Sequence, residues 1–191
     1  MATDHFATLG LPRSAALDEE TLKQAYTSLS REAHPDQEAG DEKQSTELNT
    51  AFEILLAPEK RLKHLIELEA DAAARAWKTI PLDATMMGLF DKLAPFLHSI
   101  SDYTRRKQAA TSALAKALLS GEEMKLRETA EERGTELTAL REEVEAELPD
   151  IDARRSAGDA GVVRDMQILQ AKLAYLAKWQ SQVREAFMTL V

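Results

Sequence analysis

The chain has 191 residues, a formal net charge of −9 and no cysteine, so disulfides, thiolate metal ligands and cysteine nucleophiles are excluded. Its acidic balance argues against nucleic acid and against an anionic membrane surface as partners. No window holds the ~20 apolar residues of a membrane span. The first ten residues also lack the basic and apolar regions of a signal peptide, so we expect a cytoplasmic protein.

Abundant Ala, Leu, Glu and Lys with only seven Gly and six Pro predict an all-helical fold. The first element is a short helix over residues 5–9, capped by Thr3 or Asp4 and ended by Gly10. The next helix starts at Asp18, and its apolar residues recur at helical spacing.

The stretch His34-Pro35-Asp36 lies between two helical patterns. Because Pro35 lacks a backbone N–H and biases His34 away from the helical conformation, the preceding helix should end near His34. A polar loop over residues 37–43 follows. The stretch therefore presents an imidazole and a carboxylate at an exposed corner. The polar face of the preceding helix carries Lys23, Thr27 and Arg31.

A second apolar pattern runs from Leu48 to Leu56 and is closed by Pro58, and a further helix is predicted over residues 59–68. Two amphipathic helices joined by a short polar loop should pack as an antiparallel hairpin. The short helices before and after this hairpin would flank it.

Four blocks of residues resemble a J-domain in their order and spacing: Asp4-His5-Phe6 with Leu9-Gly10-Leu11, His34-Pro35-Asp36, Asn49 to Leu55, and Pro58-Glu59-Lys60-Arg61. The resemblance implies a co-chaperone whose His34, Pro35 and Asp36 contact a DnaK-type chaperone and trigger its ATP hydrolysis, assisted by Lys23, Thr27 and Arg31. Taken alone, the tripeptide is better explained as a helix-stopping turn, and the flanking blocks are what favour the J-domain. The helix before it is less basic than is usual in the family, which predicts weak electrostatic steering. This favours either a dedicated chaperone partner or a low-affinity encounter that a shared client strengthens.

Residues 76–83 are predicted to be a linker, and Asp83 can cap the helix that follows. This helix has an apolar stripe from Met86 to Ile100, and Pro95 is expected to kink it or split it near Ala94. A capping-box pattern at residues 120–123 predicts a new helix that ends at Pro149.

The last helix has apolar residues from Met166 to Leu190 at alternating spacings of three and four, with Gln180 as the single polar position. A second stripe of Ile168, Tyr175 and Trp179 flanks this seam. Three long amphipathic segments with short connections predict an antiparallel three-helix bundle. A homodimeric coiled coil is the alternative.

The layout of a J-domain over residues 1–75, a linker over 76–83 and a helical bundle over 84–191 resembles the HscB family of iron–sulfur cluster co-chaperones. The resemblance implies that the bundle recruits an IscU-type scaffold. The matching apolar stretch is Met86, Met87, Leu89, Phe90 and Leu93, beside Leu169, Leu173 and Leu176. Burial in the core is the competing interpretation of such a stripe. Adjacent residues such as Met86 and Met87 cannot both face one seam, and exposed methionines suit adaptable recognition surfaces.

No pattern in the sequence supports catalysis. His5, His64 and His98 have no partners at metal-ligand spacing and are interpreted as packing or surface residues. We therefore expect no enzyme, no metal and no cofactor. The alternatives to the co-chaperone of iron–sulfur assembly are a J-protein for a different client, and a structural or interaction protein with a vestigial J-domain.

Overall fold

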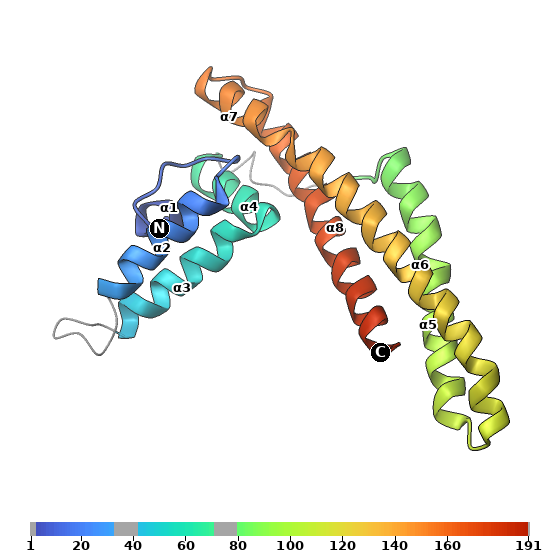
Figure 1. Cartoon of the computed structure of the whole chain (residues 1–191). Helices are drawn as coiled ribbons and strands as arrows, with labels where there is room; N and C mark the ends of the chain where they lie inside the picture. Colours follow the sequence, from blue (N-terminus) through green and yellow to red (C-terminus); the bar gives the residue numbers. More distant parts are fainter. Residues whose placement is uncertain (1–2, 33–41, 71–79, 191) are drawn as a thin grey trace. The chain divides into compact units, whose positions relative to one another are not determined.

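The structure is a computed structural model that describes residues 3–32, 42–70 and 80–190. These residues form eight helices and no strand, which confirms the predicted all-helical fold (Figure 1). Their packing divides the chain into two compact units. The first unit comprises Met1–Thr79 with Val144–Ala174, and the second comprises Ile80–Glu143 with Tyr175–Val191.

The first unit begins with α1 (His5–Thr8), whose start is fixed by Asp4 as predicted. The Asp4 carboxylate accepts hydrogen bonds from the backbone N–H groups of Phe6 and Ala7, at 3.0 and 3.3 Å. These bonds satisfy two of the donors that a helix start leaves unpaired. Gly10 then adopts a φ of +64°, a left-handed conformation that favours glycine, and the helix ends there as predicted.

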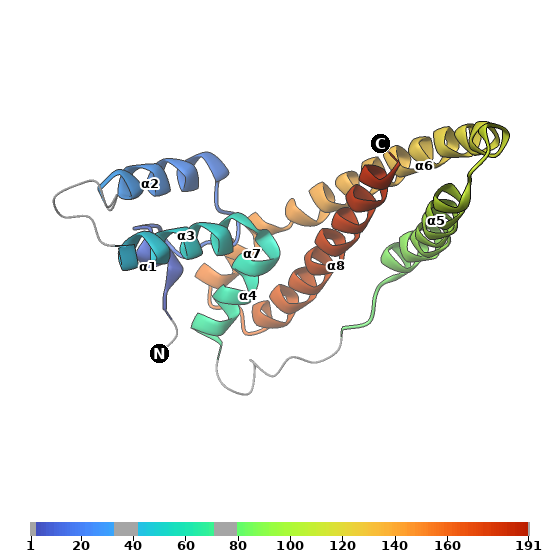
Figure 2. The same ribbon diagram turned by 90° about the horizontal axis from the view of Figure 1, so that it is seen from below.

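The predicted hairpin is formed by α2 (Glu19–Glu32) and α3 (Glu42–Leu56), which lie side by side in both views (Figures 1 and 2). The rings of Tyr26 and Phe52 stack between the two helices with centroids 4.3 Å apart. The Tyr26 hydroxyl also donates a hydrogen bond to the side-chain oxygen of Asn49 at 2.7 Å. The apolar face of the hairpin is buried at Leu22, Leu48, Ala51 and Leu55.

Helix α4 (Pro58–Glu69) packs on this hairpin and contains a buried arginine. Arg61 is only 5% exposed, and its guanidinium donates hydrogen bonds to the backbone carbonyls of Ala15 and Leu55, at 2.9 and 2.6 Å. The arginine thereby joins α4 to the loop before α2 and to the end of α3. The bonds satisfy a charge that would otherwise be costly to bury.

The first unit also contains α7 (Leu148–Ser156) and the first part of α8 (Val162–Thr189). The sequence pattern treats Pro149 as a helix end, and this is wrong: Pro149 stands in the first turn of α7, where a missing backbone N–H does no harm. The domain boundaries at residues 75 and 84 stay a prediction. Residues 71–79 lie outside the described part, and packing groups residues 144–174 with the N-terminal unit.

In the second unit, α5 (Ala84–Ala109) begins at Asp83, whose carboxylate accepts a hydrogen bond from the N–H of Met86 at 2.9 Å. The cap is as predicted, and α5 continues through Pro95, so a split of the helix there is wrong, whereas a kink stays a prediction. Pro95 and Asp91 both lie on the exposed side of the helix. The single backbone hydrogen bond that the proline removes is therefore lost where water can replace it.

The predicted helix start at residues 120–123 is also wrong, because α6 (Ala113–Glu145) runs straight through them. The helix is capped earlier by Ser112, whose hydroxyl accepts a hydrogen bond from the N–H of Ala115 at 3.1 Å. Glu123, the N3 residue of the predicted capping box, and its neighbour Glu122 instead make ion pairs. Glu122 pairs with Arg106, and Glu123 pairs with Lys107 at 2.9 Å, so both join α6 to α5.

The C-terminal part of α8 completes the bundle of the second unit. The Trp179 ring lies 6.2 Å from that of Phe90 on α5, and Arg141 on α6 donates a hydrogen bond to the Gln180 side chain at 3.2 Å. Gln180, the single polar position of the heptad seam, is therefore paired. Six of the predicted seam residues are buried: Met166, Leu169, Leu173, Leu176, Val183 and Leu190. Phe187, which the heptad pattern also places in the seam, is only partly buried, and its neighbour Ala186 is buried instead.

Candidate functional site

The exposed face of α2 carries the three side chains that the J-domain resemblance assigns to chaperone contact. Lys23, Thr27 and Arg31 follow one another at intervals of four residues, and such residues lie on one side of a helix. They line a single shallow depression together with Glu20, Gln24 and Ser28. The structure therefore brings these three predicted residues together on one accessible surface.

The charge on this face is mixed. The Lys23 ammonium lies 2.5 Å from the Glu19 carboxylate, and this hydrogen bond raises the pKa of Lys23 above its ordinary value. Both side chains are more than half exposed, so the pair contributes little to stability. Its effect is to offset part of the positive charge that would steer an acidic partner.

His34, Pro35 and Asp36 lie outside the described residues. The described part of α2 ends at Glu32, two positions before His34, and α3 begins at Glu42. The Lys23, Thr27 and Arg31 face therefore lies on the helix that leads into the tripeptide. The role of the tripeptide itself stays a prediction.

On α5 the structure separates the five residues predicted to contact a client. Met86, Leu89 and Leu93 are 1%, 7% and 1% exposed, because they lie on the inward face of the helix and fill the core. The prediction that these three residues contact a client is therefore wrong. Met87 and Phe90 are each 44% exposed and stay available to a partner.

Met87 and Phe90 lie one turn apart on α5, and Tyr175 of α8 contacts the same buried Trp179 ring as Phe90 does. We call Met87, Phe90 and Tyr175 the aromatic patch. Tyr175 is 39% exposed, and its ring centroid lies 5.7 Å from that of the buried Trp179. Trp179 also contacts Phe90 and so supports the patch from below. In the sequence, Tyr175 and Trp179 appear only as part of a second apolar stripe on the last helix. Nothing in that stripe indicates that these residues pack against α5.

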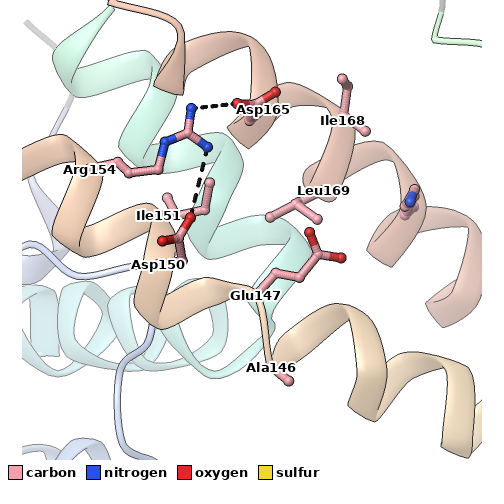
Figure 3. Close-up of a pocket in the computed structure, with 9 residues that line it drawn as sticks. Ala146, Glu147, Asp150, Ile151, Arg154, Asp165, Ile168 and Leu169 are labelled. Atoms are coloured by element: carbon pink, nitrogen blue, oxygen red, sulfur yellow. Dashed lines mark hydrogen bonds and ion pairs between the residues drawn. The ribbon is translucent and has the colours of Figure 1, made fainter. Parts of the chain in front are cut away.

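The close-up in Figure 3 shows a pocket of about 440 Å³ between α7 and the start of α8. Ile151 and Leu169 form its apolar floor, and the Arg154 guanidinium pairs there with Asp165 at 2.7 Å and with Asp150 at 3.8 Å. Arg154 thus offsets part of the negative charge that the carboxylates bring to this corner. Within residues 3–32, 42–70 and 80–190, no three His, Asp or Glu side chains gather closely enough to hold a metal ion.

The histidines behave as packing and surface residues, as predicted. His64 is 5% exposed and packs against His5, whereas His98 lies on the surface of α5 beside Asp102. None of the described helices is long and apolar enough to cross a bilayer.

Comparison with known proteins identifies the N-terminal region. The family model of the DnaJ domain matches residues 4–64. Chaperone protein DnaJ of Cyanothece sp. is 46% identical over 66 residues, which are 34% of this chain and 17% of that protein. Chaperone protein DnaJ 2 of Streptomyces coelicolor is 40% identical over 78 residues, 40% of this chain and 20% of that protein. The chain thus spans about a fifth of the length of these curated relatives. Residues 4–64 therefore form a DnaJ domain.

The whole chain has the fold of the HscB co-chaperones. Chaperone HscB from Vibrio cholerae aligns with 99% of this chain and 100% of its own, at a TM-score of 0.59 and 18% identity. Human co-chaperone protein HscB aligns with 96% of this chain and 82% of its own, at a TM-score of 0.54 and 20% identity. The likeness therefore extends through the C-terminal helices, where sequence patterns are least specific.

Proposed function

We propose that the chain is a J-domain co-chaperone that stimulates ATP hydrolysis by a DnaK-type chaperone such as HscA or DnaK. The observation that carries the proposal is the DnaJ domain over residues 4–64, in which Lys23, Thr27 and Arg31 share one exposed face of α2. Cations on that face and the carboxylate of Asp36 suit a partner surface of complementary charge. The chain itself needs no catalytic group for this role.

Steady-state ATP hydrolysis by each DnaK-type chaperone of the source organism tests this role. We expect the full chain to accelerate hydrolysis by at least one of them, and the His34→Gln variant to lose the effect. Failure to stimulate any of these chaperones, even with excess protein, would leave a J-domain without chaperone coupling. That result would favour a structural or interaction protein with a vestigial J-domain.

We further infer that the C-terminal helices recruit a client, and that this client is an IscU-type scaffold of iron–sulfur cluster assembly. Two findings support the inference: the HscB fold of the whole chain, and the aromatic patch of Met87, Phe90 and Tyr175. Exposed apolar side chains that cluster on a surface mark interaction sites, and a methionine can adapt to the shape of a partner. A chain that holds client and chaperone together raises their effective concentration without tight binding to either.

Calorimetric titration of the full chain with a purified IscU-type scaffold tests this assignment. The Phe90→Ala variant should bind about tenfold more weakly, because truncating an interface aromatic typically removes more than ~1 kcal/mol. The matched control is Leu118→Ala, which truncates a side chain that is 73% exposed on α6, away from the aromatic patch. If the chain stimulates a chaperone but does not bind the scaffold, its client is a different protein.

A further inference from the structure

Two histidine rings join the first and last helices of the DnaJ domain. His5 opens α1 and His64 lies in α4, 59 residues further along the chain, and their ring centroids are 4.5 Å apart. The backbone N–H of His5 donates a hydrogen bond to Nε2 of His64 at 3.1 Å. The Phe6 ring stacks on His64 at 5.9 Å with an interplanar angle of 16°. With Phe6 fully buried and His64 5% exposed, this junction is part of the core.

The hydrogen bond fixes the protonation state of His64. A ring nitrogen can accept a hydrogen bond only when it carries no proton, so His64 must be neutral with its proton on Nδ1. The imidazolium form would place a second N–H at Nε2, directly opposite the N–H of His5. Protonation thus replaces a hydrogen bond with two donors that face each other in the core, which is costly to bury.

The charged groups around the two rings are Asp4, Arg13, Glu67 and the rings themselves. Asp4 is already occupied, because its carboxylate caps α1 and pairs with Arg13 at 2.8 Å. The Nδ1 atom of His5 is buried and has no hydrogen-bond partner within the described residues. An N–H group formed when either ring takes up a proton would therefore find no unoccupied hydrogen-bond acceptor beside it.

The pKa values agree with this geometry. Burial lowers the pKa of His64, the neighbouring charge of His5 lowers it further, and Asp4 and Glu67 only partly oppose these effects. Burial also lowers the pKa of His5 against the opposing charge of Asp4. Both rings thus hold a proton less readily in the folded chain than in the unfolded one.

We propose that His5 and His64 form a pH-sensitive latch, which holds α1 on α4 while His64 is neutral and weakens when His64 takes up a proton. The direction of the pH dependence of stability follows from the difference in proton binding between the folded and unfolded chain. Below the ordinary histidine pKa near 6.5 the unfolded chain binds protons that the folded chain does not, so acidification favours unfolding. Each histidine that behaves in this way lowers the folding equilibrium constant up to tenfold per pH unit, and stability is unaffected above about pH 7.

Urea denaturation of the full chain at pH 7.5, 6.5 and 5.5 tests the latch, with His64→Phe as the variant. The parent should lose up to about fivefold more of its folding equilibrium constant between pH 6.5 and 5.5 than His64→Phe does, because the unfolded histidine is already half protonated at pH 6.5. The matched control is His98→Gln, which removes a surface histidine and should retain the pH dependence of the parent. Equal pH dependence in the parent and His64→Phe would overturn the proposal.

A second measurement does not require the variant to fold. NMR spectra that correlate the ring nitrogens and ring protons of the histidines report the tautomer and the titration of each ring in the unaltered chain. We expect His64 to carry its proton on Nδ1 at pH 7.5 and to titrate below 6.5. A ring that carries its proton on Nε2, or that titrates at or above 6.5, would rule out the latch.

Discussion

The Asp152 side chain bonds α7 to the loop that precedes α2, and replacing it with asparagine should destabilise the first unit. Its carboxylate accepts hydrogen bonds from the Ser14 hydroxyl at 2.6 Å and from the N–H groups of Ala15 and Ala16 at 2.8 and 2.9 Å. Arg155 adds a fourth bond at 2.5 Å. An asparagine keeps only one acceptor oxygen, and its NH₂ group would face donors.

The expected loss follows from these bonds. A hydrogen bond to a charged group contributes ~1.5–3 kcal/mol, and Asp152→Asn removes at least the bonds made by one of the two oxygens. Because Asp152 keeps 24% of its side-chain surface exposed, water compensates in part. We therefore expect a loss of about 2–4 kcal/mol in the free energy of unfolding of this unit.

Amide hydrogen exchange measures this loss where it occurs, at the N–H groups of Ala15 and Ala16. Exchange at both amides should accelerate by roughly 30- to 700-fold in Asp152→Asn, since each 1.4 kcal/mol corresponds to a factor of ten. The matched control is Asp150→Asn on the same helix, where the carboxylate is 71% exposed and 3.8 Å from Arg154. That control should change exchange by less than about threefold.

The pH dependence of the same amides gives an independent check. Burial pushes the pKa of Asp152 upward, but the hydrogen bonds from Ala15, Ala16, Ser14 and Arg155 outweigh it, and the net pKa is below the ordinary 3.8. The contribution of Asp152 is therefore complete above about pH 5 and disappears as the pH falls through the lowered pKa. Unchanged exchange at Ala15 and Ala16 in Asp152→Asn at pH 7 would refute the reasoning.

Three further predictions follow from the helices. Gly121→Ala should raise the free energy of unfolding by about 0.5–1 kcal/mol, because Gly121 lies inside α6 and a Cβ there meets nothing within 4 Å; a loss of stability in thermal unfolding would contradict a continuous α6. Arg61→Met should cost about 2–4 kcal/mol in urea denaturation, since it leaves two buried carbonyls without their donor; a change below ~0.5 kcal/mol would contradict this reasoning. Lys23→Ala should change the free energy of unfolding by less than ~0.5 kcal/mol but weaken the stimulation of the chaperone ATPase. The control Lys63→Ala on α4 should leave this stimulation intact. Equal effects of the two variants on stimulation would argue against a chaperone contact on α2.

Much of the fold could be predicted from the sequence because local signals and packing agree there. The caps at Asp4 and Asp83, the helix end at Gly10 and most of the heptad pattern of α8 appear in the structure as expected. In each of these places the local preference of the residue and its burial favour the same conformation.

The predicted helix starts and ends are wrong where contacts with residues far away in the sequence determine the structure. Glu122 and Glu123 resemble a helix start in the sequence, but they pair with α5, and α6 continues past them. Pro149 resembles a helix end but stands at the start of α7. The bonds between Asp152 and residues 14–16 span 136–138 positions, and no local pattern could indicate them.

One candidate site could be predicted from local sequence patterns, and the other could not. A spacing of four places Lys23, Thr27 and Arg31 on one face, so that surface could be predicted from helical geometry alone. The aromatic patch depends on the contact of Phe90 with Trp179 across two helices. Helical periodicity gives the apolar stripe of α5, but only packing shows that Met86 faces inward while Met87 is exposed.

The central claim is that one chain couples a client to a DnaK-type chaperone, and the most direct test is the ATPase rate of that chaperone with the full chain and an IscU-type scaffold together. We expect the two proteins together to stimulate hydrolysis more than the sum of their separate effects. We also expect His34→Gln to abolish the stimulation by the chain and Phe90→Ala to reduce only the part that depends on the scaffold. No stimulation by the unaltered chain, or equal stimulation by the chain and His34→Gln, would contradict this coupling.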